Sequence, residues 1–112
     1  MPFSGFGRGM KYTSVPNAIF GPLLEQIQDA AELKVTLRSL WLFHRKRGRP
    51  QVARQSEFLN DPTLLRGLGG LGRAPREEIR RGLELAVGRG TLLMHQPDKD
   101  DELSRVLSLI HI

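Results

Sequence analysis

The sequence "PREEIRRGLELAVGRGTLLMH" (residues 75–95) changes from a helical pattern to a strand pattern at a pair of glycines. Its first part carries apolar side chains at the spacing of one helical face, namely Ile79, Leu83, Ala86 and Val87. Pro75 suits the first position of a helix, and a glycine suits the position just after its last turn. We therefore expect a helix that begins at Pro75, ends within "GRG" (88–90) and leads directly into a strand.

A β-hairpin is predicted after this helix. The segments "TLLMHQ" (91–96) and "LSRVLSLI" (103–110) have the composition of strands, and the turn-forming "PDKDDE" (97–102) separates them. Helices followed by a terminal hairpin are the chain order of a winged helix, in which the helix before the hairpin is offered to DNA. The expected fold is mainly α (α+β), a winged helix-turn-helix whose wing is the C-terminal β-hairpin.

The clearest helical signal upstream is "DAAELKVTLRSLWLF" (29–43). Asp29 is expected to cap this helix, and Glu32 stands at the third helical position, as in a capping box. The expected buried face consists of Leu33, Leu37, Leu40 and Trp41, with Ala30 below them, and it is widened by Val35, Leu42 and Phe43. Gly48 is expected to end the helix.

Shorter elements are expected around these two helices. "PNAIFGPLLEQIQ" (16–28) has helical spacing, a short helix is expected from Ser56, and Pro62 opens a further turn or two. "GLGGLG" (67–72) has the glycine spacing of a dinucleotide site, but such a site needs a strand immediately before it. Because a helical turn precedes it here, we expect a flexible loop.

One domain is expected, because 112 residues match the usual domain size and no internal repeat is present. Residues 1–14 are rich in glycine and predict a flexible N-terminal arm, and residues 15–112 are assigned to the winged-helix domain. The terminal "LSLIHI" (107–112) is equally consistent with a β-rich terminus and with a non-native or truncated end. No functional role is therefore assigned to it.

Composition narrows the class of protein. The absence of cysteine excludes disulfides and cysteine-ligated zinc. No apolar run is long enough for a membrane helix, and the N-terminus has no secretory signal. These features predict a cytoplasmic protein without a membrane partner. The net charge of +5 favours association with polyanions.

No catalytic or metal-binding motif is recognisable. His44, His95 and His111 are far apart and lack the spacing of metal ligands. The serines lack the context of a nucleophile elbow. We therefore expect no enzyme, no metal and no cofactor.

Two clusters of cations are the candidate DNA-binding sites instead. Arg76 and Arg80 lie one turn apart in the N-terminal half of the expected helix. A recognition helix contacts base edges with this half. The candidate DNA-binding residues are Arg73, Arg76, Arg80 and Arg81 around this helix, with Lys46, Arg47, Arg49 and Arg54 as supporting phosphate contacts. The alternative for both clusters is ordinary solvated charge near helix ends and faces. The acidic turn at 97–102 also counts against DNA, because carboxylates repel phosphate.

The stretches "VPNAIFGPLLEQIQDAAELKVTLRSLWLFHRKRG" (15–48) and "REEIRRGLELAVGRGTLLMH" (76–95) resemble the N-terminal winged-helix domain of DnaD-type replication proteins, particularly divergent bacterial versions. The resemblance covers roughly residues 11–106. It implies a domain that self-associates and takes part in primosome assembly, without catalysis or cofactor. Replication proteins and DNA are the partners that it implies.

The leading hypothesis is a non-enzymatic, DNA-associated domain in replication initiation that contacts DNA phosphates independently of sequence. One alternative is a winged-helix transcriptional regulator, which would discriminate strongly among duplexes. The other is a protein interaction module that uses the winged helix as a dimer surface and does not bind DNA.

Overall fold

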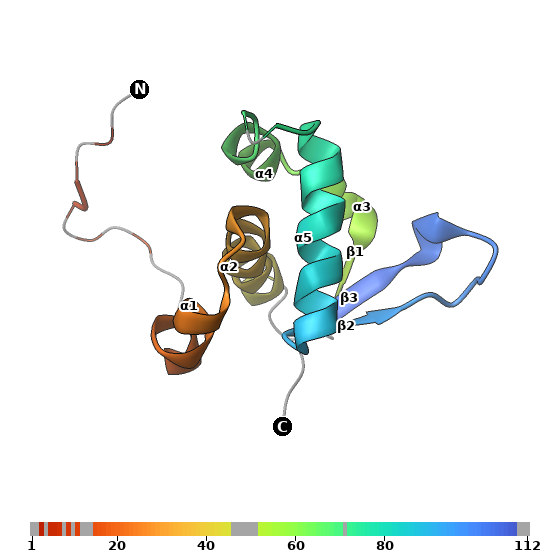
Figure 1. Ribbon diagram of the computed structural model, residues 1–112, viewed down its shortest axis with the longest axis horizontal. Helices are drawn as coiled ribbons and strands as arrows, with labels where there is room; N and C mark the ends of the chain where they lie inside the picture. Colours follow the sequence, from red (N-terminus) through yellow and green to blue (C-terminus); the bar gives the residue numbers. More distant parts are fainter. Residues whose placement is uncertain are drawn as a thin grey trace.

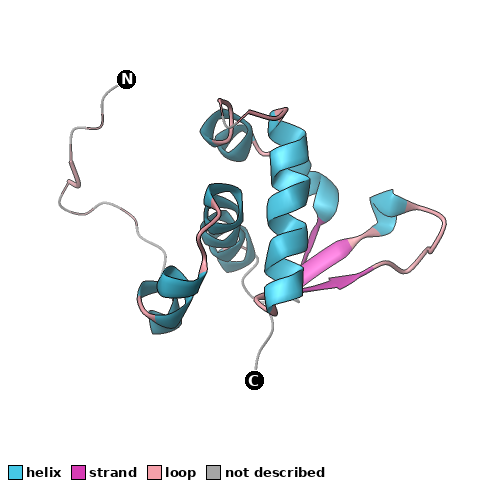
Figure 2. Cartoon of the chain, viewed as in Figure 1, coloured by secondary structure: helices cyan, strands magenta, loops and turns pink. Residues whose placement is uncertain are grey.

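The computed structural model describes residues 3, 5–7, 9, 11, 15–45, 52–70 and 72–109. Its elements are, in chain order, the 3-10 helix η1 (Asn17–Phe20), α1 (Pro22–Gln26), α2 (Ala30–His44), β1 (Val52–Arg54), α3 (Gln55–Leu59), α4 (Pro62–Gly67), α5 (Pro75–Arg89), β2 (Leu92–His95), the 3-10 helix η2 (Glu102–Ser104) and β3 (Val106–Leu109). Together they form an α+β fold in which the hairpin of β2 and β3 projects from the helical body (Figures 1 and 2).

The sheet has three antiparallel strands in the order β1–β3–β2, so the last strand of the chain is the central one. Leu107 on β3 lies opposite Ala53 on β1 and Met94 on β2, and its side chain is buried in the core. A shift of one residue would turn Leu107 to the other face, so its burial fixes the strand register. Residues 107–109, to which we assigned no role from the sequence, are therefore structurally central.

Helix α5 crosses α2 at the centre of the molecule (Figure 1). The predicted stripe of α5 is confirmed, since Ile79, Leu83 and Ala86 are buried and Val87 packs against the core. At Gly82 the two helices approach so closely that a Cβ atom would lie 2.7 Å from the carbonyl oxygen of Ala31. The predicted end of α5 is also confirmed, because Gly90 adopts a left-handed conformation (φ 93°) that favours glycine.

The buried face of α2 agrees with the expected one only in part: Val35, Leu40, Leu42 and Phe43 are buried as expected. Leu37 is 42% exposed, and Leu33 and Trp41 are only half-buried. The buried residues of α2 are Ala31, Glu32, Val35, Thr36, Ser39, Leu40, Leu42 and Phe43. Trp41 is partly buried and packs against the core, and the guanidinium carbons of Arg38 and Arg45 lie 3.7 and 4.6 Å from the centre of its ring.

Asp29 caps α2 as expected, because its Oδ1 accepts a hydrogen bond from the backbone N–H of Glu32 at 3.0 Å. The second contact of a capping box, in which the Glu32 side chain would accept from the backbone N–H of Asp29, was also expected, and this prediction was wrong. The buried carboxylate of Glu32 accepts instead from Arg89, with Nε to Oε2 at 2.5 Å and Nη2 to Oε1 at 3.0 Å. A buried carboxylate needs a charged partner, and α5 supplies it.

The short elements are partly as expected. Gly21 and Pro22 divide the helix expected over 16–28 into η1 and α1. Helix α3 begins at Gln55, one residue before the expected start, and α4 begins at Pro62. Strand β1 was not expected from the sequence. It has only three residues, and its one partner among the described strands is β3, which follows much later in the chain.

Other described segments complete the comparison. Those residues of the N-terminal 14 that the structure describes are exposed and belong to no helix or strand. The glycine segment that begins at the end of α4 forms turns, and a helix rather than a strand precedes it, which excludes the dinucleotide-binding arrangement. The helix end expected at Gly48 lies outside the described residues, in which α2 ends at His44. None of the described helices is long and apolar enough to cross a membrane.

Candidate nucleic-acid interface on helix α5

The outward face of α5 carries Arg76 and Arg80, and both side chains are exposed. Arg76 Nη2 donates to Asn60 Oδ1 at 3.2 Å, which ties it loosely to the end of α3. Arg80 Nη1 lies 3.4 Å from Glu102 Oε2, and the two side chains are 48% and 54% exposed. An ion pair so open to water contributes little, so a phosphate could replace Glu102 as the partner of Arg80.

Arg81 does not belong to this face, although the sequence placed it there. Its guanidinium donates to Glu78, with Nη2 to Oε2 at 2.9 Å, and to Asp29 Oδ2 at 2.5 Å. The hydrogen bond that Arg81 donates to Glu78 is the main reason that the pKa of Arg81 is raised, and the one that it donates to Asp29 adds to it. Arg81 thus joins α5 to the start of α2, and its donors are already engaged.

Glu78 also binds Arg73. Arg73 Nη1 donates to Glu78 Oε1 at 3.1 Å, although the arginine side chain itself is 56% exposed. The hydrogen bond from Arg81 lowers the pKa of Glu78 most, and the one from Arg73 lowers it further. Glu78 is nearly inaccessible to solvent, so these two cations neutralise a buried carboxylate. Within α5, Arg81 therefore pairs with Glu78, three residues before it.

The supporting cluster is described only in part. Arg54 is exposed on β1, and its backbone N–H donates to Glu57 Oε2 at 2.7 Å. The other predicted members, Lys46, Arg47 and Arg49, lie outside the described residues. Of the eight predicted contacts, only Arg54, Arg73, Arg76 and Arg80 are therefore both described and available at the surface.

The turn of the hairpin is acidic and internally ordered. It carries Asp98, Asp100, Asp101 and Glu102 against the single cation Lys99. The backbone N–H of Asp100 donates to Asp98 Oδ1 at 3.1 Å, and Ser104 Oγ donates to the carbonyl oxygen of Asp101 at 2.7 Å. Beside the turn, Glu102 Oε1 lies 3.3 Å from Arg105 Nη2, so this carboxylate faces two arginines.

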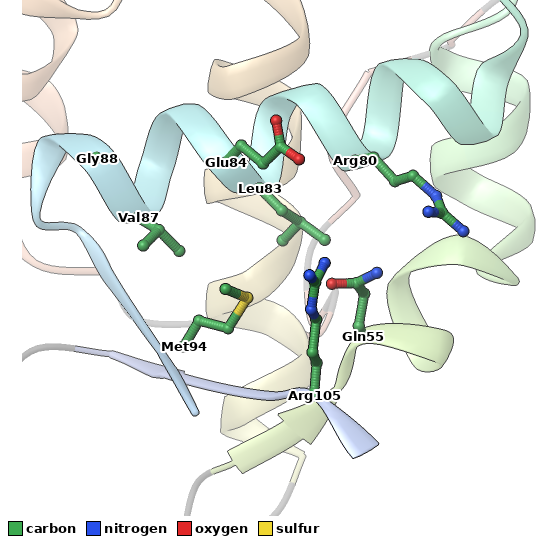
Figure 3. A pocket seen from close by; sticks show the side chains of 8 residues that line it. All are labelled: Gln55, Arg80, Leu83, Glu84, Val87, Gly88, Met94 and Arg105. Atoms are coloured by element: carbon green, nitrogen blue, oxygen red, sulfur yellow. The ribbon is translucent and has the colours of Figure 1, made fainter. Parts of the chain in front are cut away.

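A cleft of about 220 Å³ lies between α5 and the hairpin (Figure 3). Leu83 and Val87 of α5 and Met94 of β2 form its apolar part (Figure 3). Polar side chains complete the lining, namely Gln55, Arg80, Glu84 and Arg105. Sequence reasoning missed this cleft, although the exposed Met94 in a strand next to the helix was a usable signal.

No cluster of three or more histidine, aspartate and glutamate side chains with the geometry of a metal site occurs within residues 15–45, 52–70 and 72–109. The cleft likewise contains arginines and a glutamate but no histidine or serine. Its composition suits recognition by charge and apolar contact.

Comparison of the chain with models of protein families, with curated proteins and with solved structures finds no match. Function must therefore be argued from the geometry of the chain itself.

Proposed function

We propose that the chain is a non-enzymatic winged-helix domain that acts in the initiation of DNA replication, within primosome assembly. It would do so through self-association, through contacts with replication proteins, and through sequence-independent contacts with DNA phosphates. The proposal combines the resemblance to the N-terminal domain of DnaD-type proteins with the arrangement of the elements.

The observation that carries the proposal is the topology. A helix, a short strand, further helices and a terminal hairpin follow one another, and β3 lies between β1 and β2. A winged helix has this chain order, which supports the proposal that α5 acts as the recognition helix and the β2–β3 hairpin as the wing. The segment before α5 contains α4, so the helix-turn-helix is longer than a minimal one.

The exposed arginines of α5 support a phosphate contact. Arg76 and Arg80 point away from the core and have only one weak partner each among the described residues. Arg54, just before α3, and Arg73, just before α5, add exposed positive charge. Charges of this kind bind the DNA backbone without reading its sequence.

The acidic hairpin favours a second candidate function, a protein interaction module without DNA binding. A wing that grips DNA should be basic, whereas this turn carries four carboxylates and one lysine. Glu102 also forms an ion pair with Arg80, so the wing neutralises part of the positive surface that DNA would contact. The cleft between α5 and the hairpin would then be the partner site.

A salt titration of DNA affinity separates the two candidates. We expect the wild-type chain to bind duplex DNA weakly at low salt, with little difference between sequences. Arg76→Ala and Arg80→Ala should each lower affinity and reduce the slope of log affinity against log salt by about 1. Arg66→Ala, which removes an equal charge from α4, is the matched control and should leave the slope unchanged.

Two results would contradict the DNA role of α5. One is the absence of measurable binding at low salt, which selects the interaction module. The other is a salt slope that does not change in either variant of α5. A strong preference for one duplex would instead indicate a transcriptional regulator.

A further inference from the structure

A groove between α2 and α4 carries positive charge and is separate from the face of α5. It has a volume of about 360 Å³ and is lined by Lys34, Leu37, Arg38, Trp41, Thr63, Leu64 and Gly67. These residues include the cations Lys34 and Arg38 and no acid, but Arg38 forms an ion pair with the buried Asp61, so Lys34 supplies the unneutralised charge of the lining. Lys34 Nζ donates to the carbonyl oxygen of Gly67 at 2.6 Å, so this cation is held at the junction of the two helices.

Arg38 is held in the groove in a similar way. Its Nε and Nη2 donate to the two carboxylate oxygens of Asp61 at 2.7 and 3.1 Å, and Asp61 is buried. Arg45 adds a further cation over the Trp41 ring. Leu37 offers exposed apolar surface beside these charges. Tryptophan and arginine side chains that lie next to each other are typical of surfaces that bind a protein partner tightly.

The chain carries a surface of the opposite charge on the hairpin turn, residues 97–102. Asp98 and Asp100 are exposed there, and hydrogen bonds within the turn fix its shape. The hairpin projects from the side of α5 that is opposite to α2, so the turn does not reach the groove of its own chain (Figure 1). An ordered projection loses little conformational freedom when it binds.

We propose that the α2–α4 groove of one copy binds the acidic hairpin turn of a second copy. This inference rests on the self-association in the proposed function and assigns the two surfaces that make the contact. Opposite potentials steer the turn towards the groove, and Leu37 and Trp41 give an apolar contact once it arrives. Because groove and turn are different surfaces, two chains can exchange turns in a symmetric dimer, or copies can join head to tail in longer assemblies.

The charges predict how the association responds to salt. Exposed ion pairs are individually weak and are screened by ions, whereas a contact between apolar faces is not. We therefore expect the association constant to fall about tenfold or more between about 0.05 M and about 0.5 M salt.

Paired charge reversals test the inference on the full chain by sedimentation equilibrium at low salt. Lys34→Glu in the groove and Asp100→Lys in the turn should each lower the association constant about tenfold. An equal mixture of the two variants should associate again, because each supplies the surface that the other has lost. Glu25→Lys, an equal charge reversal at an exposed position of α1, is the control and should associate like the wild-type chain.

Several outcomes would overturn the inference. A wild-type chain that stays monomeric removes it, together with the self-association in the proposed function. A self-associating chain that tolerates both reversals, or a mixture that does not recover, removes the inference alone. If Lys34→Glu lowers DNA affinity and leaves association unchanged, the groove binds nucleic acid and not a second copy. The salt titrations of DNA affinity with Arg76→Ala and Arg80→Ala do not depend on any of these results.

Discussion

Gly82 lies where α5 passes over α2, and its lack of a side chain is what allows that approach. A Cβ atom there would lie 2.7 Å from the carbonyl oxygen of Ala31 and 2.9 Å from Val35 Cγ2. The first of these is a backbone atom, which cannot turn aside as the end of a side chain could. An added methyl group would therefore separate two helices that form the centre of the core.

We expect Gly82→Ala to lower the free energy of unfolding by about 1–3 kcal/mol, through overpacking. Alanine favours a helix over glycine by about 1 kcal/mol, so the loss would be larger without that gain. Gly88→Ala on the same helix is the matched control, since nothing lies within 4 Å of its added Cβ, and it should stabilise the protein. Urea unfolding measures both. Equal effects of the two substitutions would show that the helices can separate at no cost.

At the scale of elements, Asp29 has two roles at the start of α2. It caps the helix through the backbone N–H of Glu32, and it binds Arg81 of α5. The hydrogen bond from Arg81 is the largest cause of its lowered pKa, and the one from the N–H of Glu32 contributes further. Because the pKa values of Asp29 and Glu78 both fall on folding, their ionised forms stabilise the native state.

This stabilisation should be complete above the ordinary pKa values of 3.8 and 4.5 and should be lost as the pH falls below them. Asp29→Asn keeps a capping oxygen and removes the charge. We therefore expect it to be less stable than the wild type at neutral pH, and to lose less stability on acidification. Urea midpoints at about pH 7 and about pH 3 measure this difference.

Asp29→Ala separates the two roles, because it removes the cap as well as the charge. It should be less stable than Asp29→Asn by about 1 kcal/mol. An unchanged acid dependence in both variants would mean that the contact with Arg81 does not contribute to stability.

The same elements show how far the sequence predicts the fold. Helix α5 was predictable, because its buried stripe is apolar and is bounded by Pro75 and Gly90. The complete buried face of α2 was not predictable, because small and polar residues form part of it. Ala31 is buried where the helix must admit α5, and Glu32 is buried because Arg89 neutralises it. Hydrophobic periodicity cannot detect either reason.

The candidate site was predictable only in part for a similar reason at the scale of the whole molecule. The partners of the cations are distant in the sequence: Arg81 binds Asp29 and Arg89 binds Glu32, 52 and 57 residues away. A list of basic residues therefore could not tell that Arg81 joins helices while Arg80 stays at the surface. The groove between α2 and α4 likewise depends on how two separate helices pack.

The position of β3 in the sheet makes the end of the described chain important for stability. A chain that stops at Arg105 lacks the strand that pairs with both β1 and β2, and it loses the buried Leu107. Removal of one buried leucine side chain costs about 2–5 kcal/mol, out of a typical total of about 5–15 kcal/mol. We expect no cooperative thermal unfolding for this chain, measured by circular dichroism.

A chain that stops at Leu109 is the control. It keeps all the described pairs of β3 with its two neighbours, and we expect it to unfold cooperatively. If the chain that stops at Arg105 unfolds cooperatively with the wild-type midpoint, the helices are stable without the sheet.

The same strand order has a consequence for the time course of folding. The β2–β3 hairpin joins neighbouring segments and can close early, whereas Val52 on β1 must wait for Ser108, which follows much later in the chain. On the ribosome, β1 emerges long before its partner and remains an unpaired edge until β3 has been synthesised. Its shortness, only three residues, limits the surface open to wrong pairing during that interval.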